Sequence, residues 1–214
     1  MVYQSIGDYS KALDYDQQAL KVQRELGDKS GEGTILGNIG IVYGILNDYP
    51  MALDQFQQAL KIDRELGDKS SQGKDLGNLG IVYKTMGDYP RALDYDQQAL
   101  KLSRETGDKN GEGNDLGNTG VVYMALGDYA RALDYYQQAL KLHREVGDKT
   151  GEADNLSNIG VIYEDQGDYS KAVDSYRQAL KIKQSAGVPT ELVEQVMGDV
   201  YLCLLYTSPS PRDS

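Results

Sequence analysis

The chain has 214 residues and is acidic, because 33 aspartates and glutamates outnumber 22 lysines and arginines and leave a net charge of −11. Nucleic acids and anionic membrane surfaces bind proteins through clustered Lys and Arg, so this charge argues against both kinds of partner. The only cysteine, Cys203, cannot form an internal disulfide bond. No apolar run reaches the roughly 18 residues of a membrane-spanning helix and no secretory signal is recognisable, so we expect a cytoplasmic protein.

A short motif, Gly-Asp-Tyr or Asn-Asp-Tyr, returns every 40 residues along the chain. Its copies start at Gly7, Asn47, Gly87, Gly127 and Gly167. A strict period of about 20 to 50 residues is typical of a solenoid, in which each unit packs mainly against its neighbours. We therefore expect a linear array of repeated units.

Each period contains two stretches with the spacing of an amphipathic helix. In residues 111–149 the first stripe is Leu116, Thr119, Gly120, Val122, Tyr123 and Leu126, and the second is Ala132, Leu133, Tyr136, Ala139, Leu140 and Val146. The first helices are expected to open at residues whose side chains can accept from free backbone amides, namely Ser30, Ser70, Asn110 and Thr150. The second helices are expected to end at Gly27, Gly67, Gly107 and Gly147. One period is therefore a helical hairpin.

In chain order, residues 1–29 are predicted to hold a truncated first repeat in which only the second helix is complete. Four full hairpins follow, at 31–69, 71–109, 111–149 and 151–187. Residues 190–205 are interpreted as a degenerate first helix or cap, and residues 206–214 as a disordered tail or a sequence scar. The chain is thus interpreted as a fragment, whose exposed N-terminal helix offers an edge for end-to-end self-association.

The repeated columns resemble the signature of the tetratricopeptide repeat (TPR) family. In one copy the matching residues are Leu116, Gly120, Tyr123, Gly127, Tyr129, Ala132, Tyr136 and Ala139. The family's helix-ending proline is replaced by Arg24, Arg64, Arg104 and Arg144, so the second helix can run on and the unit is 40 residues long. This longer unit is similar to the repeats of Pins-type G-protein-signalling adaptors and of kinesin light chains. The resemblance implies an all-α TPR solenoid, a right-handed superhelix of antiparallel helix hairpins.

The sequence offers no catalytic constellation, no metal site and no cofactor site. His143 occupies a column that holds Gln23, Asp63, Ser103 and Lys183 in the other copies, which favours an ordinary surface position over a buried or catalytic one. No His/Cys cluster could bind zinc, and the aspartate-rich joints lack calcium-loop spacing. The glycine-rich run from Gly31 to Gly40 lacks the Lys-Ser/Thr pair of a phosphate loop. We expect a protein that is not an enzyme.

One asparagine recurs in every full first helix, at Asn38, Asn78, Asn118 and Asn158. Asparagine is a poor helix former, so its return needs a compensating role. Its amide could bond the backbone of the neighbouring repeat and fix the superhelix pitch. Alternatively, it could bond the peptide groups of an extended ligand, since a carboxamide offers both an acceptor and donors. In the resembled families asparagines of this column line the concave groove, which implies the second role.

The same geometry implies further groove columns. They hold Thr34, Lys74, Asn114 and Asp154, and then Gly44, Lys84, Met124 and Glu164. Six residues of these columns differ between copies and are candidates for ligand specificity, namely Lys74, Lys84, Asn114, Met124, Asp154 and Glu164. The column Gly37, Gly77, Gly117 and Ser157 could leave room for a ligand backbone or could simply tolerate small residues, whereas Gly40, Gly80, Gly120 and Gly160 would let the two helices of a hairpin approach.

We therefore predict an interaction scaffold or adaptor that binds a protein or peptide segment in its concave groove, with an acidic ligand residue near the lysines and a basic one near the acidic residues. The alternative is the sensory or regulatory TPR region of a larger signalling protein, such as a nucleotide-switch ATPase or a transcription regulator. Two residues of one column stay unexplained at this point, because Asp16 and Asp96 stand where Phe56, Tyr136 and Tyr176 supply a bulky ring.

Overall fold

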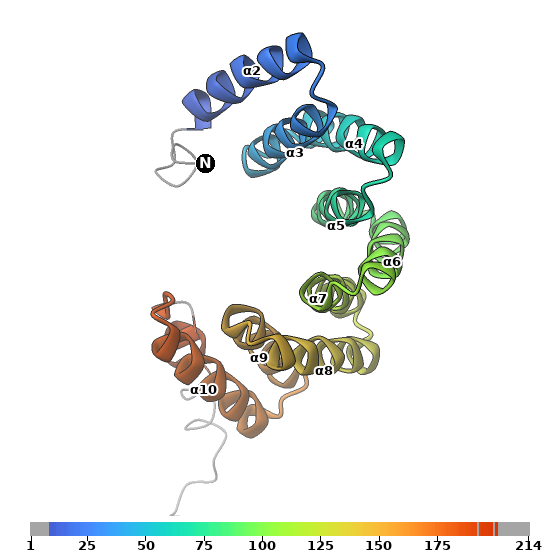
Figure 1. Ribbon diagram of the computed structural model, residues 1–214. Helices are drawn as coiled ribbons and strands as arrows, with labels where there is room; N and C mark the ends of the chain where they lie inside the picture. Colours follow the sequence, from blue (N-terminus) through green and yellow to red (C-terminus); the bar gives the residue numbers. More distant parts are fainter. Residues whose placement is uncertain (1–8, 192, 199, 201–214) are drawn as a thin grey trace, which may run out of the picture. The chain divides into compact units, whose positions relative to one another are not determined.

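The structure is a computed structural model that describes residues 9–191, 193–198 and 200. Helices dominate this part of the chain (Figure 1). Their bounds are Tyr9–Leu26 (α2), Lys29–Ile45 (α3), Tyr49–Leu66 (α4), Lys69–Thr85 (α5), Tyr89–Thr106 (α6), Lys109–Ala125 (α7), Tyr129–Val146 (α8), Lys149–Asp165 (α9) and Tyr169–Ala186 (α10). The predicted tail at 206–214 and the first helix of the truncated repeat lie outside the described residues.

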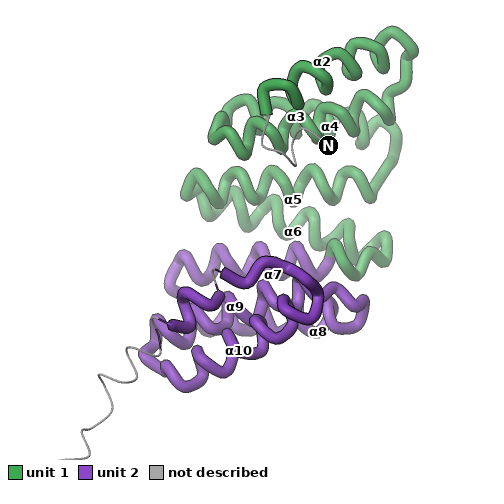
Figure 2. The backbone as a smooth tube through the Cα atoms, turned by 90° about the vertical axis from the view of Figure 1, so that its left-hand side faces the viewer, with its two compact units in different colours: residues 1–111 green, residues 112–214 purple. Residues whose placement is uncertain are grey.

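The chain divides into two units, residues 1–111 and residues 112–214 (Figure 2). In the first unit α3 packs on α4 and α5 on α6, while α2 packs on α3 and α4 on α5. In the second unit α8 packs on α9 and α9 on α10. In both units, helices that are neighbours in sequence therefore pack together, and the predicted class, all-α with consecutive helix hairpins, is confirmed.

Helix starts differ from the sequence prediction. The caps of the first helices are Asp28, Asp68 and Asp148, whose carboxylates accept from the backbone N–H of the residue three positions on. The four predicted opening residues already lie inside the first helices, namely Ser30, Ser70, Asn110 and Thr150. An aspartate can cap as well as a serine, and the turn after each glycine brings the aspartate to the free amides first. The predicted ends are confirmed, since glycines at 67, 107 and 147 have φ of 71°, 71° and 78°.

In three hairpins a glycine of the first helix packs against an aromatic ring of the second helix, and in the α5/α6 hairpin Gly80 packs against Asp96 instead. A Cβ added to Gly40 would lie 2.8 Å from the Phe56 ring, and one added to Gly120 would lie 2.8 Å from the Tyr136 ring. Phe56 and Tyr136 are fully buried. The prediction that this column lets the two helices approach is confirmed.

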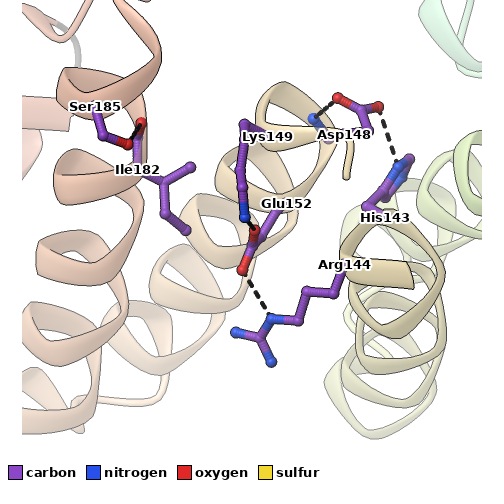
Figure 3. Close-up of polar contacts among 8 residues, drawn as sticks. His143, Arg144, Asp148, Lys149, Glu152, Ile182 and Ser185 are labelled. Atoms are coloured by element: carbon purple, nitrogen blue, oxygen red, sulfur yellow. Dashed lines mark hydrogen bonds and ion pairs between the residues drawn. The ribbon is translucent and has the colours of Figure 1, made fainter. Parts of the chain in front are cut away.

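His143 is buried, contrary to the surface position expected from its variable column. Only 2% of it is exposed, and it lies against Gly113 of α7 and Gly151 of α9. Its Nδ1 is 3.2 Å from Oδ2 of Asp148, the cap of α9 (Figure 3). The column lies at the joint between a second helix and the following first helix, where neighbouring glycines leave space for side chains of different size. Variation in this column therefore reflects changes in packing.

Candidate peptide-binding face

The recurrent asparagines occupy equivalent positions on the first helices. Asn38 on α3 and Asn78 on α5 belong to the first unit, and Asn118 on α7 and Asn158 on α9 belong to the second. All four are half-buried. Within the described part of the chain, none of the four amides takes part in a hydrogen bond. The described residues therefore show no bond of the kind that the pitch-fixing alternative requires.

Branched apolar residues lie one helical turn beyond these asparagines. Ile41 follows Asn38 by three positions and Ile81 follows Asn78 by three, and such pairs share a helix face. Ile41 is 42% exposed and Ile81 is 40% exposed. The equivalent Val121 of the second unit is half-buried. These apolar side chains were missed as site candidates, although their fixed spacing from the asparagines was a readable signal.

The column one turn before the asparagines is exposed and varies in charge. In the first unit it holds Thr34, whose hydroxyl donates to the carbonyl of Ser30 (3.0 Å), and Lys74. In the second unit it holds Asn114 and Asp154, and Asp154 lies 2.8 Å from Nζ of Lys183. The face is thus positively charged on α5 and contains a partly neutralised carboxylate on α9.

The column that contains Lys84, Met124 and Glu164 contacts the second helix of its own hairpin. The Tyr136 hydroxyl donates to Sδ of Met124 (3.9 Å), and the Tyr176 hydroxyl donates to Oε2 of Glu164 (2.8 Å). Burial lowers the pKa of the Lys84 ammonium group, and the charge of Asp96 opposes that shift. These three side chains therefore have partners inside the hairpin, which the sequence did not indicate.

This pairing explains Asp96, one of the two residues that the sequence left open. Residues twelve positions apart meet across each hairpin, as Met124 with Tyr136 and Glu164 with Tyr176. In the α5/α6 hairpin the equivalent residues are Lys84 and Asp96. Asp96 is 1% exposed, and a buried carboxylate needs a nearby cation. The lysine and the aspartate thus replace the ring contact of the other hairpins.

The glycine column that starts at Gly37 lies against the next first helix. A Cβ added to Gly37 would lie 3.6 Å from Oδ1 of Asp75, and one added to Gly117 would lie 3.3 Å from Oδ1 of Asn155. Both Asp75 and Asn155 are buried. The small residues of this column therefore accommodate neighbouring side chains, which favours the packing interpretation over a space for ligand backbone.

The described residues contain no cluster of three or more His, Cys, Asp or Glu side chains suited to a metal ion. None of their helices is both long enough and apolar enough to cross a membrane.

The helix pairs, the glycine contacts and the glycine helix ends define a helical-hairpin repeat protein. The tetratricopeptide repeat profile matches residues 1–65, 52–105, 75–140 and 116–185. The chain belongs to the tetratricopeptide repeat family. No curated protein is similar enough in sequence to count as a match.

Several solved structures share the fold. BtubC from P. vanneervenii is 18% identical with a TM-score of 0.71, over 96% of each chain. A Rap protein complexed with competence and sporulation factor is 19% identical with a TM-score of 0.77, over 86% of this chain and 51% of that one. A signal-transduction ATPase with a tetratricopeptide repeat sensor, from Pyrococcus horikoshii, is 21% identical with a TM-score of 0.74, over 94% of this chain and 34% of that one.

Proposed function

We propose that the chain is an interaction adaptor that binds a segment of a partner protein along the first-helix face of its units. The observation that carries this proposal is the set of amides at Asn38, Asn78, Asn118 and Asn158, which are half-buried and have no hydrogen bond within the described residues. A carboxamide on a helix face can accept from one peptide group and donate to another. The four amides would therefore bond the backbone of the ligand.

Repeat spacing supports an extended ligand within each unit. Packed helices lie about 10 Å apart, and an extended chain advances about 3.3 Å per residue. Each asparagine would thus meet the ligand at about every third residue. The two asparagines of a unit contribute about 1 kcal/mol each, which is weaker than millimolar affinity, so ligand side chains must supply the remainder.

The side chains beside the asparagines define the ligand that would bind best. Ile41 and Ile81 offer apolar contact, and Lys74 favours an acidic ligand residue on the first unit. Asp154 favours a basic ligand residue on the second unit, in competition with Lys183. The ligand would also contact any exposed surface of the three residues that have partners inside their hairpins, namely Lys84, Met124 and Glu164.

A second proposal is that the array is the sensory region of a larger signalling protein. It is favoured by the similarity to the ATPase with a tetratricopeptide repeat sensor, of which this chain covers 34%. A linked effector domain in the full reading frame would support this proposal, and its absence would support a free-standing adaptor. Self-association through the N-terminal edge remains a separate prediction for either case.

The adaptor proposal is tested with peptides selected from a random 15-residue phage library on the wild-type chain. Simultaneous replacement of Asn38, Asn78, Asn118 and Asn158 by Ala should weaken their binding at least tenfold in fluorescence polarisation. Replacement of the exposed second-helix amides Gln17, Gln97 and Gln137 by Ala is the matched control and should leave binding unchanged. Equal affinity of the selected peptides for the asparagine variant and the wild type would refute the proposal, provided circular dichroism shows that both are folded.

A further inference from the structure

A three-residue ion network recurs where a second helix meets the following first helix. In the first unit Nε of Arg24 and Nζ of Lys29 lie 2.8 Å and 2.7 Å from the two carboxylate oxygens of Glu32. In the second unit Arg144 and Lys149 each lie 2.8 Å from Glu152 in the same way (Figure 3). The hydrogen bonds from Lys29 and Arg24 lower the pKa of the buried Glu32 carboxyl group. The glutamate therefore holds both cations.

The joint between α4 and α5 lacks this glutamate, because Gln72 stands in its place. The Gln72 amide donates to the carbonyl of Asp63 (3.0 Å). Lys69, which would otherwise pair with the missing carboxylate, lies 2.7 Å from Oε2 of Glu105 on α6. The guanidinium of Arg64 makes neither an ion pair nor a hydrogen bond with any described residue. Arg64 therefore lacks the carboxylate partner that Arg24 and Arg144 have.

Arg64 lines a hollow of about 420 Å³ between α4 and α6. Both helices belong to the first unit. The lining consists of five residues of α4 and two of α6, namely Gln57, Leu60, Lys61, Arg64, Glu65, Tyr95 and Gln98. The ring of Tyr95 stacks on Tyr83 with centroids 5.3 Å apart, so this wall is held in place. The hollow combines a cationic group, amides and an apolar wall.

The charges around the hollow fit one negative charge. Lys61 and Arg64 contribute two positive charges and Glu65 contributes one negative charge, which leaves a net charge of plus one. A guanidinium binds a carboxylate through two parallel hydrogen bonds. A phosphate near pH 7 carries a larger charge, which would be repelled by Glu65. The hollow therefore suits a carboxylate better than a phosphate.

We propose that this hollow binds the carboxylate of an Asp or Glu side chain of a partner protein, with Arg64 as the principal ligand-binding residue. The site lies between second helices and does not use the asparagines of the first-helix face. It is therefore independent of the adaptor proposal and can fail or succeed separately.

The test is an NMR titration of the full chain that follows the Arg64 Nε–Hε resonance. The probe is N-acetyl-glutamate N-methylamide, and N-acetyl-glutamine N-methylamide is its neutral control. We expect saturable shifts of this resonance with the glutamate probe and at least tenfold weaker effects with the glutamine probe. Equal shifts with both probes, or binding of inorganic phosphate without binding of the glutamate probe, would overturn the proposal.

The matched variant is Gln72→Glu, which recreates the network of Arg24 and Arg144. It returns an internal carboxylate to Arg64 and should weaken binding of the glutamate probe at least tenfold. Because a glutamate already occupies this position at the three other joints, as Glu32, Glu112 and Glu152, the variant should fold, which circular dichroism verifies. Undiminished probe binding by Gln72→Glu would contradict the proposal. Arg64→Gln lacks the monitored resonance, so its binding is followed through the backbone amide resonances of α4, and the shifts that the glutamate probe causes there in the wild type should be lost.

Discussion

Two buried carboxyl groups, those of Asp63 and Asp75, face each other at the joint between α4 and α5. Both side chains are buried, and Oδ2 of Asp75 finds no hydrogen-bond partner among the described residues. Burial, followed by the charge of Asp63, raises the pKa of Asp75 to about 8. Burial also raises the pKa of Asp63, while a hydrogen bond from Asp75 opposes the shift. The pair of carboxyl groups therefore holds a proton at a pH at which an isolated aspartate has lost it.

This pair should make the stability of the first unit depend on pH. The folded pKa of Asp75 lies above the unfolded value of 3.8, so the folded state binds the extra proton. Its stabilising contribution is complete below the unfolded pKa and is lost as pH rises through about 8. The loss can reach about 1.4 kcal/mol per pH unit. Urea unfolding of the wild type between pH 5 and 9 should show this decline, and Asp75→Asn should flatten it.

The exposed Asp94→Asn is the control for this pH experiment and should leave the profile of the wild type unchanged. A wild-type profile that stays flat from pH 5 to 9, or one that is the same in Asp75→Asn, would show that the pair does not share a proton. The direction of the pH dependence distinguishes this pair from surface ion pairs, because a protein that depends on carboxylates paired with cations becomes less stable as pH falls.

At the scale of the element, α3 contains two glycines one turn apart with opposite roles. Gly40 lies against the ring of Phe56, whereas nothing lies within 4 Å of a Cβ added to Gly44. Glycine costs a helix interior about 1 kcal/mol relative to alanine. The cost is therefore unavoidable at Gly40, where the ring needs the space, but not at Gly44.

We expect Gly40→Ala to destabilise the protein by about 1 to 3 kcal/mol, because the ring or the backbone must move to accept a methyl group. Gly44→Ala should stabilise it by up to about 1 kcal/mol through helix propensity alone. Both changes are measured as free energies of unfolding in urea. An equal effect of the two substitutions would mean that the ring contact does not determine the choice of glycine.

At the scale of the whole molecule, each unit has its own buried side chains. One cluster of the first unit includes Phe56, Leu60 and Leu79, and a second includes Leu36 and Ile39. The cluster of the second unit runs from Ala132 to Val200 and contains the buried rings of Tyr136 and Tyr176. Contacts between sequential helices supply these clusters, as expected for a repeat array.

A fragment of residues 108–200 should therefore fold by itself. The fragment carries the complete second cluster, from Ala132 to Val200, and keeps Asp108, whose carboxylate accepts from the backbone N–H of Gly111 (2.9 Å). Far-ultraviolet circular dichroism should show a helical spectrum with a cooperative thermal transition. A coil spectrum would show that residues of the first unit are needed. A shorter fragment of residues 128–200, which lacks α7, is the comparison and should be less stable.

The sequence by itself determined the period, the hairpins, the glycine helix ends and the family, because these depend on contacts close in sequence that every copy repeats. It also marked the asparagine column, whose role stays a prediction. The tertiary structure alone decided that Asp148 caps α9, that His143 is buried and that Lys84 faces Asp96. It also showed that Arg64 lacks the carboxylate partner of Arg24 and Arg144, because Gln72 stands where those joints have a glutamate. These facts depend on which side chains meet across a joint between helices. A variable column in the sequence shows only that the residue differs between copies. The role of that residue is set by the size and charge of the side chains around it, which only the tertiary structure shows.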